Sequence, residues 1–466
     1  MKTYEFMRRS RVGAPAADVF DWLTRPGAFE RLAPPWEHVR AISRSGSAPQ
    51  TGSRTEFEVH IGPVRQRWVA EHTAYEAGRM FRDEQIAGPF ARWVHTHTVE
   101  PDGPLACVLE DRVEYALPLG ALGGLLGASH VQKRLETAFA YRQAVVAQDV
   151  QAHRSWRPGP MHVLVTGASG LIGGALLPYL MAGGHTVARV ARPGGRTVRM
   201  PGFPLDTVTW DPTGNTPPTA GSLEGFDAVV HLAGESIASG RWSEARKQRI
   251  RDSRVRGTKA LAAELSKLSR PPRVLVAASA IGFYGDRGDE NLIETSPRGQ
   301  CFLAEVCEEW EAATAAARSS GIRTVNLRTG VVTSPLGGAL AKMLPPFRMG
   351  AGGVVGDGRQ WMSWITLDDL LDVILHAIAD ASLSGPVNAV APHPVMNEEW
   401  TKTLGRVLGR PTLVPMPAFA ARAAFGEMAD ELLLSSTRVI PEKLLAARHT
   451  YRYLELEPAL RGMLGK

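Results

Sequence analysis

The stretch that decides the fold spans residues 163–173 and reads VLVTGASGLIG. Glycines stand at positions 167, 170 and 173, directly after an apolar run and before the apolar residues Leu176, Leu177 and Leu180. The first glycine permits a tight turn, the second lets the backbone approach a pyrophosphate, and the third lets a helix pack closely on a strand. The helix start adds N–H donors and the positive end of a dipole. The stretch predicts a strand–turn–helix unit that binds a dinucleotide, the alternative being a plain glycine-rich turn.

The residues downstream of this turn alternate between short apolar runs and helical patterns. We expect strands over residues 162–165, 186–190, 228–232, 274–278 and 324–327. This layout predicts a Rossmann-type, doubly wound parallel sheet over residues 161–400. The alternation loosens after about residue 335, where glycine-rich loops and helices take over. We interpret the loosened part as a lobe that covers a substrate.

The end of the second strand separates the two nicotinamide nucleotides, because NAD sites usually place an acidic residue there for the ribose 2′-hydroxyl. This chain reads VARP at 190–193, without a carboxylate. Arg192 can hold a 2′-phosphate through two hydrogen bonds, with Arg189 and Arg196 as substitutes, although a solvated surface arginine is the other interpretation. We therefore predict NADP(H) rather than NAD(H). The other residues expected around the cofactor are Gly167, Ser169, Gly170, Leu171, Ile172, Gly173, Leu232, Ala233, Gly234, Glu235, Ala278 and Arg328.

Residues 1–150 show a different pattern, in which alternating runs are separated by glycine and proline. We expect strands over residues 4–12, 54–61, 65–74, 93–99 and 106–115, a helix after Pro15, and a closing helix marked by Val131, Leu135, Phe139 and Val146. This order predicts an α+β domain in which a curved antiparallel sheet grips a helix. Residues 151–160, QAHRSWRPGP, predict a linker.

Composition excludes several classes of protein. The 466 residues are 44% hydrophobic and 21% charged, as in ordinary globular chains. The excess of 53 basic over 47 acidic residues is thin, so we expect no nucleic-acid partner. Cys107, Cys301 and Cys307 form no C-x-x-C pair, which argues against a disulfide framework or a zinc site. The N-terminus has no secretory leader, and the longest uncharged apolar stretch, residues 116–129, is too short to span a bilayer, so we expect a cytoplasmic protein.

Residues 161–466 resemble the extended short-chain dehydrogenase/reductase superfamily and, within it, the atypical YfcH-like epimerase family with its own C-terminal domain, which the resemblance implies to be a helical domain over residues 401–466. The resemblance rests on the stretches at 166–173, 232–237, 241–242, 253–258, 279–285, 307–311, 328–330, 352–365 and 438–444. Residues 1–150 resemble the START-like helix-grip fold of the polyketide cyclase type, through GPF at 88–90 and WVHTH at 93–97.

The resemblance implies a catalytic Tyr-x-x-x-Lys pair and a Ser or Thr, but this chain lacks the pair. Ser279 is the candidate serine, although the count from Tyr284 places Ala280 there. Where the Tyr and Lys should stand, near the start of the next helix, the chain has Leu303 and Cys307.

Two hypotheses follow from the missing pair. In the first, the protein is an NADP(H)-dependent oxidoreductase or epimerase-like enzyme in which Tyr284, Glu235 or Cys307 replaces the usual acid, although each also suits a structural role. In the second, it is a catalytically silent NADP(H)-binding regulator or sensor.

Two further ligand sites are expected. Arg241, Trp242, Gln360, Trp361 and Trp364 are candidates to line a small-molecule substrate pocket under the C-terminal lobe, the alternative for the last two being packing between lobes. The helix-grip resemblance implies a cavity for a hydrophobic ligand, with residues 116–129 at its entrance or at the helix start. His95 and His97 alternate on one strand, but the sequence shows no third ligand, so we predict no metal site. The sequence leaves the oligomeric state open.

Overall fold

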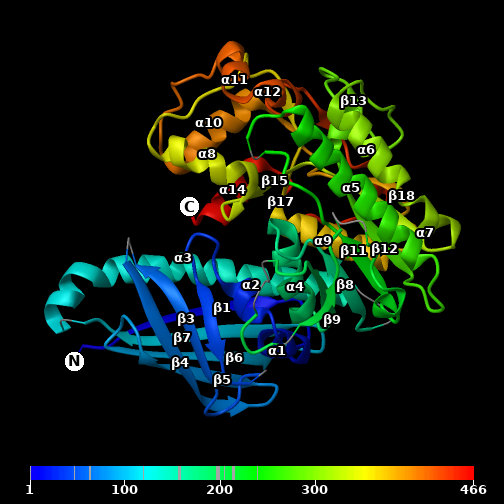
Figure 1. Cartoon of the computed structure of the whole chain (residues 1–466). Helices are drawn as coiled ribbons and strands as arrows, with labels where there is room; N and C mark the ends of the chain where they lie inside the picture. The colour runs from blue at the N-terminus through cyan, green and yellow to red at the C-terminus, as the bar shows by residue number, and fades with distance from the viewer. Residues whose placement is uncertain are drawn as a thin grey trace.

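The computed structural model describes every residue except 1, 47, 62–63, 119, 156–158, 196–199, 204, 213–215 and 239; at 61, 120–126 and 220 it describes the backbone alone. Figure 1 shows an N-terminal domain, a central domain beside it, and a C-terminal lobe above. No helix of the described chain is long and apolar enough to cross a bilayer.

The N-terminal domain is a seven-stranded antiparallel sheet that holds one long helix. The sheet order is β1-β7-β6-β5-β4-β3-β2. Its elements are β1 (Tyr4–Val12), α1 (Ala16–Thr24), α2 (Ala28–Leu32), β2 (Arg40–Arg44), β3 (Arg54–Ile61), β4 (Val64–Glu76), β5 (Met80–Ala87), β6 (Arg92–Pro101), β7 (Cys107–Ala116) and α3 (Gly120–Arg154). The helix-grip prediction is confirmed, and all five expected strands are present.

The sequence analysis did not predict two strands of this sheet. The strand β5, MFRDEQIA, carries charged residues at its centre and lacks clean alternation. The strand β2 has only five residues, most of them exposed or half-buried. Both become strands because they pair with neighbours that the hydrophobic pattern specifies strongly, a tertiary effect that local pattern does not record.

The central domain confirms the Rossmann-type prediction. Its parallel sheet has the order β10-β9-β8-β11-β12-β14-β18. The strands are β8 (His162–Thr166), β9 (Thr186–Ala191), β10 (Asp206–Thr209), β11 (Ala228–His231), β12 (Val274–Ala280), β14 (Arg323–Thr329) and β18 (Gly385–Ala389). The helices are α4 (Leu171–Ala182), α5 (Glu244–Leu265), α6 (Phe302–Ala312), α7 (Ala315–Ser319) and α9 (Leu367–Ala379).

Successive side chains of β8 pack alternately into the two hydrophobic cores of this domain, one on each face of the sheet. Val163 and Val165 pack with α4 and α9 on one face. Leu164 packs with α5 and α7 on the other face. A strand buried on both faces reads as a continuous apolar run, which is why the first strand was visible in the sequence.

The C-terminal lobe is built from several segments that are separated in the sequence. Its helices are α8 (Gly338–Arg348), α10 (Asn397–Leu408), α11 (Ala418–Phe425), α12 (Glu427–Leu432), α13 (Glu442–Ala446) and α14 (Leu456–Leu464). Short strand pairs join it to the central domain: β13 (Asn291–Leu292) with β20 (Arg438–Val439), β15 (Val331–Ser334) with β17 (Trp364–Thr366), and β16 (Trp361–Met362) with β19 (Val395–Met396). Leu340, Trp400 and Leu460 share one core. The expected boundary at residue 400 therefore falls inside α10.

The N-terminal domain docks on the α4–α9 face of the central domain through a buried charge cluster. Asp149 of α3 is 0% exposed and pairs with Arg31 of α2 at 2.8 Å and with Arg452 at 2.8 Å. Arg452 also pairs with Asp372 of α9 at 2.6 Å, and Arg31 with Asp368 of α9 at 2.8 Å. Burial works to raise the pKa of Asp149, but the two arginines outweigh it and hold that pKa below its ordinary value.

The expected linker is shorter than the sequence indicated. The helix α3 continues to Arg154, so residues 151–154 are helical, while 156–158 lie outside the described residues. The helix persists because its end packs on the central domain, where the His153 and Tyr179 rings lie 4.5 Å apart.

Candidate functional site

The glycine turn at the end of β8 is built as its sequence requires. Gly167 has a φ of 69°, and a Cβ there would lie 2.7 Å from the Leu232 carbonyl. A Cβ at Gly173 would lie 2.9 Å from Ala168 Cα, so only glycine allows α4 to approach the turn. Gly170 is the N-cap of α4 and brings no side chain over the first N–H groups of that helix. The turn therefore presents an unobstructed helix N-terminus, which suits a pyrophosphate.

The segment that follows β11 lies against the glycine turn, and a network of buried polar side chains holds this segment in place. Thr166 Oγ1 accepts the N–H groups of Leu232 at 3.1 Å and Ala233 at 3.2 Å. His231, 0% exposed, lies between Thr166 Oγ1 at 2.8 Å and Thr258 Oγ1 at 3.0 Å. Burial lowers the pKa of His231 to about 4, so the imidazole is neutral at pH 7.

The end of β9 is basic, as expected. Arg192 is exposed one residue past the strand. Arg189 Nε donates to Thr207 Oγ1 at 3.1 Å on the neighbouring strand, so it is engaged within the sheet. Arg196 lies outside the described residues.

Ser279, the candidate serine, lies near the end of β12 and is 4% exposed. Its Oγ donates to Glu311 Oε1 at 2.7 Å. Arg328 holds both oxygens of Glu311, through Nε at 2.8 Å and Nη2 at 2.9 Å. The expectation that Arg328 contacts the cofactor is therefore not favoured, because its guanidinium is 3% exposed and faces into the fold.

Tyr284 was a candidate acid, and the structure assigns it a structural role. It is 0% exposed, and its hydroxyl donates to Asn388 Oδ1 at 2.7 Å while accepting from Arg328 Nη1 at 3.0 Å. Burial raises the pKa of Tyr284 despite the nearby Arg328. A phenol in this position does not reach a substrate.

Cys307 was the second candidate acid, and it is also buried. It is 3% exposed on α6, and burial, followed by the charge of Glu311, raises the pKa of Cys307 to about 12. A neutral thiol inside the fold neither attacks a substrate nor readily gives up its proton. Leu303, at the expected Tyr position, packs against Gly282.

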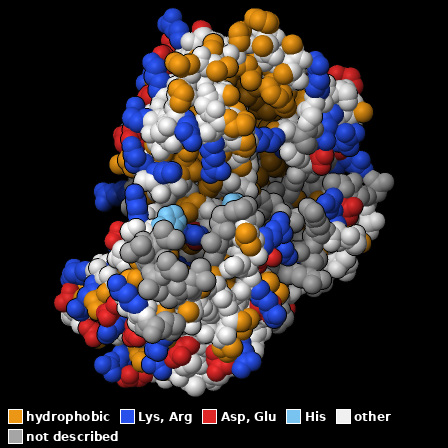
Figure 2. Space-filling view, turned by 90° about the vertical axis from the view of Figure 1, so that its left-hand side faces the viewer, with side chains coloured by type: hydrophobic (Ala, Val, Ile, Leu, Met, Phe, Trp, Pro, Cys, Tyr) orange, Lys and Arg blue, Asp and Glu red, His pale blue; other side chains and the backbone are white. Residues whose placement is uncertain are grey.

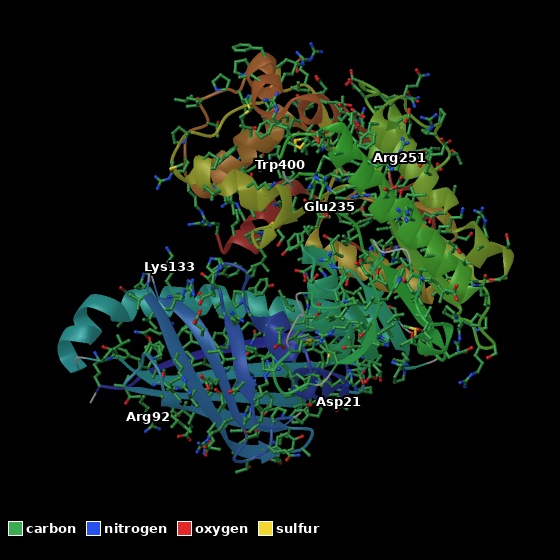
Figure 3. All side chains as sticks on the ribbon, in the orientation of Figure 1. Asp21, Arg92, Lys133, Glu235, Arg251 and Trp400 are labelled. Atoms are coloured by element: carbon green, nitrogen blue, oxygen red, sulfur yellow. The ribbon has the colours of Figure 1, made fainter. Side chains whose placement is uncertain are left out.

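Glu235 remains at the domain junction. It lies near the middle of the molecule, below Trp400 of the lobe (Figure 3). Its Oε1 accepts from Arg246 Nη1 at 2.9 Å, and 41% of its side chain is exposed. It does not cap the following helix, because Ser243 does so.

The lobe residues expected around a substrate divide into two groups. Trp364 is 0% exposed in the lobe core, and the Gln360 amide donates to the carbonyls of Val355 and Leu433, so both are structural. Trp361 stacks under Arg438 at 4.2 Å.

Arg241 and Trp242 stay at the junction between the central domain and the lobe. Arg241 is exposed and lies against Gly426, at the turn between α11 and α12. The Trp242 ring meets Phe302 edge-on at 5.4 Å. These two residues therefore lie where the central domain meets the lobe.

Glu431 is a residue that sequence reasoning missed. Its carboxylate, from α12, accepts the N–H groups of Phe302 at 3.1 Å and Leu303 at 2.9 Å and so caps α6. Burial raises the pKa of Glu431. The contact spans 128 residues, and nothing in the local sequence of either segment signals it.

Exposed hydrophobic side chains gather on the C-terminal lobe, on the face seen in Figure 2. They include Met349, Leu413, Val414, Met416 and Phe419. Backbone hydrogen bonds join residues 352–354 to residues 414–416 beneath this patch.

The N-terminal domain contains a cavity of about 270 Å³ between its sheet and α3. Its lining includes the aromatic side chains of Phe29, Phe57, Trp68, Trp93, Phe139 and, from the central domain, Phe203. Its polar lining residues include Glu37, Arg44, Arg54 and Arg142, besides a cluster formed by His72, Asp83, His95 and His97, which we call its polar end. The lining suits a mainly apolar ligand with a polar end.

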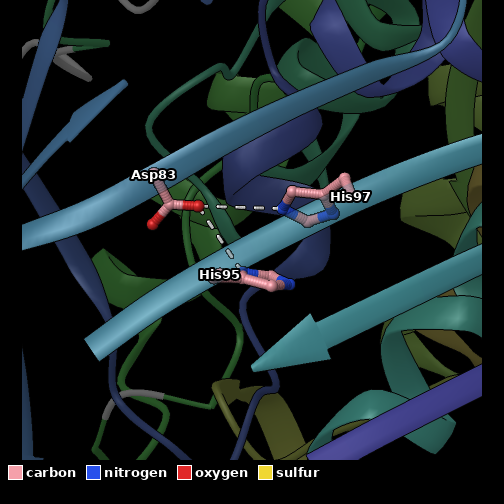
Figure 4. Close-up of side chains that lie close together, drawn as sticks. All are labelled: Asp83, His95 and His97. Carbon is pink, nitrogen blue, oxygen red and sulfur yellow. Dashed lines mark ion pairs between the residues drawn. The ribbon is translucent and has the colours of Figure 1, made fainter. Parts of the chain in front are cut away.

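The sequence showed no third ligand beside His95 and His97, but the structure brings a third candidate side chain to them. The structure places Asp83 beside both imidazoles, and potential ligand atoms of the three residues all lie within 4.8 Å of one another (Figure 4). Asp111 lies behind them, 3% exposed. Burial opposes ionisation of Asp111, but hydrogen bonds from the two histidines lower its pKa.

Three family models match the chain. Residues 163–389 match the NAD dependent epimerase/dehydratase family, residues 416–463 a domain of unknown function (DUF1731), and residues 12–139 the polyketide cyclase/dehydrase and lipid transport family. An epimerase family protein of Mycobacterium bovis is 44% identical over 299 residues, which cover 64% of this chain and 96% of that protein. The human epimerase family protein SDR39U1 is 37% identical over 307 residues, covering 65% of this chain and 100% of that protein.

The similar solved structures include the following two. One, described as the nucleoside-diphosphate sugar epimerase from Corynebacterium glutamicum, has a TM-score of 0.79 and 34% identity, and the match covers 99% of this chain and 90% of that chain. The other is human SDR39U1 (isoform 2) with NADPH, with a TM-score of 0.59 and 36% identity, covering 65% of this chain and 99% of that chain.

Proposed function

The chain belongs to the epimerase family, with a polyketide cyclase-type domain at its N-terminus, and on this basis we propose that it is an NADP(H)-dependent oxidoreductase or epimerase-like enzyme acting on a small molecule. The observation that carries the proposal is the unobstructed N-terminus of α4 at Gly170, combined with Arg192 where an NAD site usually holds a carboxylate. The NADPH in the human relative supports this choice of nucleotide.

NADP(H), when bound, donates or accepts a hydride. Around it, Leu171 and Ile172 would bind the pyrophosphate through backbone N–H groups, Gly170 having its own N–H bonded to the Gly167 carbonyl, and Arg192 would bind the 2′-phosphate. Ser279 is 4% exposed, so it would meet only a substrate atom that reaches the end of β12; there its hydroxyl proton goes to Glu311, and its Oγ lone pairs would accept from a substrate hydroxyl. Arg241 and Trp242 would contact the substrate from the lobe side.

Binding titrations with NADPH and NADH test the nucleotide assignment. We expect the parent protein to prefer NADPH at least tenfold, and Arg192→Ala to lose that preference because a phosphate loses its bidentate partner. Arg273→Ala is a matched control, since Arg273 is an exposed arginine at the opposite end of the sheet, before β12. An unchanged preference in Arg192→Ala would disprove the 2′-phosphate assignment.

Turnover is tested with NADP(H) and a panel of carbonyl compounds and nucleoside-diphosphate sugars, the latter suggested by the description of the Corynebacterium structure. We expect Ser279→Ala to reduce kcat, whereas Cys307→Ala and Tyr284→Phe change activity only as far as they change stability. A strong loss of kcat in a stable Cys307→Ala variant would contradict these roles.

The second candidate function is a catalytically silent NADP(H)-binding regulator. It is favoured by the inward-facing positions of Tyr284 and Cys307, which remove two possible proton donors. Tight NADPH binding without turnover on any compound of the panel would support this function over the first.

We further propose that the N-terminal cavity binds a hydrophobic small molecule. The aromatic lining from Phe57, Trp68 and Phe139 supports this. Displacement of a fluorescent fatty-acid probe from the full chain measures it, and Phe139→Arg should abolish probe binding by filling the cavity with a charge. NADPH affinity serves as the control for folding.

A further inference from the structure

The polar end of the N-terminal cavity is formed by three neighbouring strands. Asp83 lies on β5 directly opposite His95 on β6, and His97 on β6 lies directly opposite Asp111 on β7. Figure 4 shows Asp83 Oδ2 facing both imidazoles. The separations are 3.6 Å to His95 Nδ1 and 4.0 Å to His97 Nε2, both longer than a hydrogen bond.

The opposite nitrogen of each imidazole faces the second carboxylate. His95 Nε2 lies 3.2 Å and His97 Nδ1 2.8 Å from Asp111 Oδ1. Gln143 of α3 donates to the other oxygen of Asp111 at 2.7 Å and fixes its orientation. A carboxylate so close to a ring nitrogen favours a proton on that nitrogen. The nitrogens that face Asp83 then carry lone pairs.

This arrangement combines two features that metal sites share. One nitrogen of each imidazole faces the Asp83 carboxylate, and potential ligand atoms of the three residues lie within 4.8 Å of one another. A second carboxylate, that of Asp111, lies against the remote nitrogens of the two histidines. Bonds of about 2.0–2.2 Å to a tetrahedral ion separate its ligands by ~3.4 Å. Asp83 would need to shift by only a few tenths of an ångström to reach that spacing.

We propose that Asp83, His95 and His97 bind a divalent transition-metal ion such as Zn²⁺ or Fe²⁺ at the polar end of the cavity. Imidazole with carboxylate suits these ions. Three protein ligands leave at least one coordination position open, and it faces the apolar cavity. The ion would bind the carbonyl or hydroxyl oxygen of an otherwise hydrophobic ligand.

The surroundings include charges of both signs. His72 lines the same end of the cavity as Asp83, and Arg142 of α3 also lines the cavity. Asp83 and Asp111 place two carboxylates against the two imidazoles. A dication offsets their negative charge. His72 would be a fourth ligand only if its ring turned toward Asp83.

The test is a titration of the full, chelator-treated chain with ZnCl₂ and with CoCl₂. We expect one site per chain with micromolar or tighter affinity, and Co²⁺ absorption bands typical of nitrogen and oxygen ligands. Asp83→Asn and His97→Ala should each weaken binding at least tenfold. Asp111→Asn, a positioning variant, should weaken it by about 10- to 100-fold without changing the stoichiometry.

The chain offers a matched control in another histidine pair. His376 and His449 face each other with their Nδ1 atoms 3.0 Å apart, and His376 Nε2 lies 3.2 Å from Asp380. His449→Ala should leave Zn²⁺ binding unchanged. Thermal unfolding without metal and NADPH affinity report whether each variant is folded, and the half-buried, isosteric Asp83→Asn replacement keeps the test usable if His97→Ala fails to fold.

Three results would overturn the proposal. They are no saturable binding of either ion at 100 µM, binding that survives Asp83→Asn and His97→Ala unchanged, and binding lost only in His449→Ala. None of them bears on the nucleotide site, because Asp83, His95 and His97 belong to the N-terminal domain.

Discussion

The side chains of Ser279, Glu311, Arg328 and Tyr284 form a continuous buried network at the ends of β12 and β14. The sequence identified three of these residues as candidates for the site. It did not show that Glu311 neutralises Arg328, because the partners are 17 residues apart and meet only after the sheet forms. At the scale of the residue, the sequence predicted which chemical groups lie at the site, but it did not predict how far each side chain is exposed.

Glu311→Gln tests the strength of this network. The change leaves Arg328, 3% exposed, without its carboxylate, and breaking a buried ion pair from one side costs about 3–5 kcal/mol. We expect the free energy of unfolding, measured in urea, to fall by that amount. Glu398→Gln, at the exposed Glu398–Lys402 pair, should cost less than about 1 kcal/mol. Equal losses in both variants would contradict the network.

His231 predicts how stability depends on pH. Burial lowers the pKa of His231 to about 4, below the unfolded value of about 6.5. Below pH 6.5 the unfolded chain binds a proton that the folded chain refuses, so stability is lost as the pH falls toward 4. His231→Gln should make the loss between pH 7 and pH 5 smaller by about 2 kcal/mol, as measured by urea unfolding at both values. An identical loss in parent and variant would exclude a buried neutral imidazole.

Elements are positioned by close backbone contacts that side chains would prevent. The start of α4 lies against the turn after β8 through Gly173, and the start of α2 lies against α4 through Gly27, whose Cβ would come 2.8 Å from Pro178 Cα. The first contact was predicted from the spacing of the glycines. The second joins two domains and has no counterpart in a local motif.

Substituting two adjacent glycines separates the effect of close packing on stability from the effect of helix propensity. A Cβ at Gly173 would lie 2.9 Å from Ala168 Cα, whereas one at Gly174 would meet only the Ala168 carbonyl oxygen at 3.5 Å. Gly173→Ala should cost about 1–3 kcal/mol of stability and weaken NADPH binding at least tenfold. Gly174→Ala should be neutral or stabilise the protein by up to ~1 kcal/mol, because alanine favours helix. A larger loss of stability in Gly174→Ala than in Gly173→Ala would show that the closest backbone contact is not at Gly173.

The whole molecule is held together by the charge cluster of Arg31, Asp149, Arg452, Asp372 and Asp368, which three parts of the chain share. Buried charges in such a cluster are costly unless every one is paired. The cluster makes the N-terminal and central domains mutually dependent.

Asp149→Asn tests that dependence. It leaves Arg31 and Arg452 without the carboxylate between them, so we expect a loss of about 3–5 kcal/mol and unfolding in two transitions instead of one. Calorimetry measures both quantities. The exposed Asp21–Arg25 pair gives the control, and Asp21→Asn should keep a single transition. A single, unshifted transition in Asp149→Asn would mean that the interface does not depend on the cluster.

The sequence by itself determined the two kinds of sheet, the dinucleotide turn and the family, because glycine spacing and hydrophobic periodicity are local properties that each segment carries whatever its neighbours are. Only the tertiary structure decided what the side chains face. Tyr284, Cys307 and Trp364 had suitable chemistry but are enclosed by segments distant in sequence. Asp83 meets His95, and His97 meets Asp111, through the register of three antiparallel strands, one of which, β5, the sequence did not reveal. Register depends on how whole strands pack on a common core, and no local pattern contains that information.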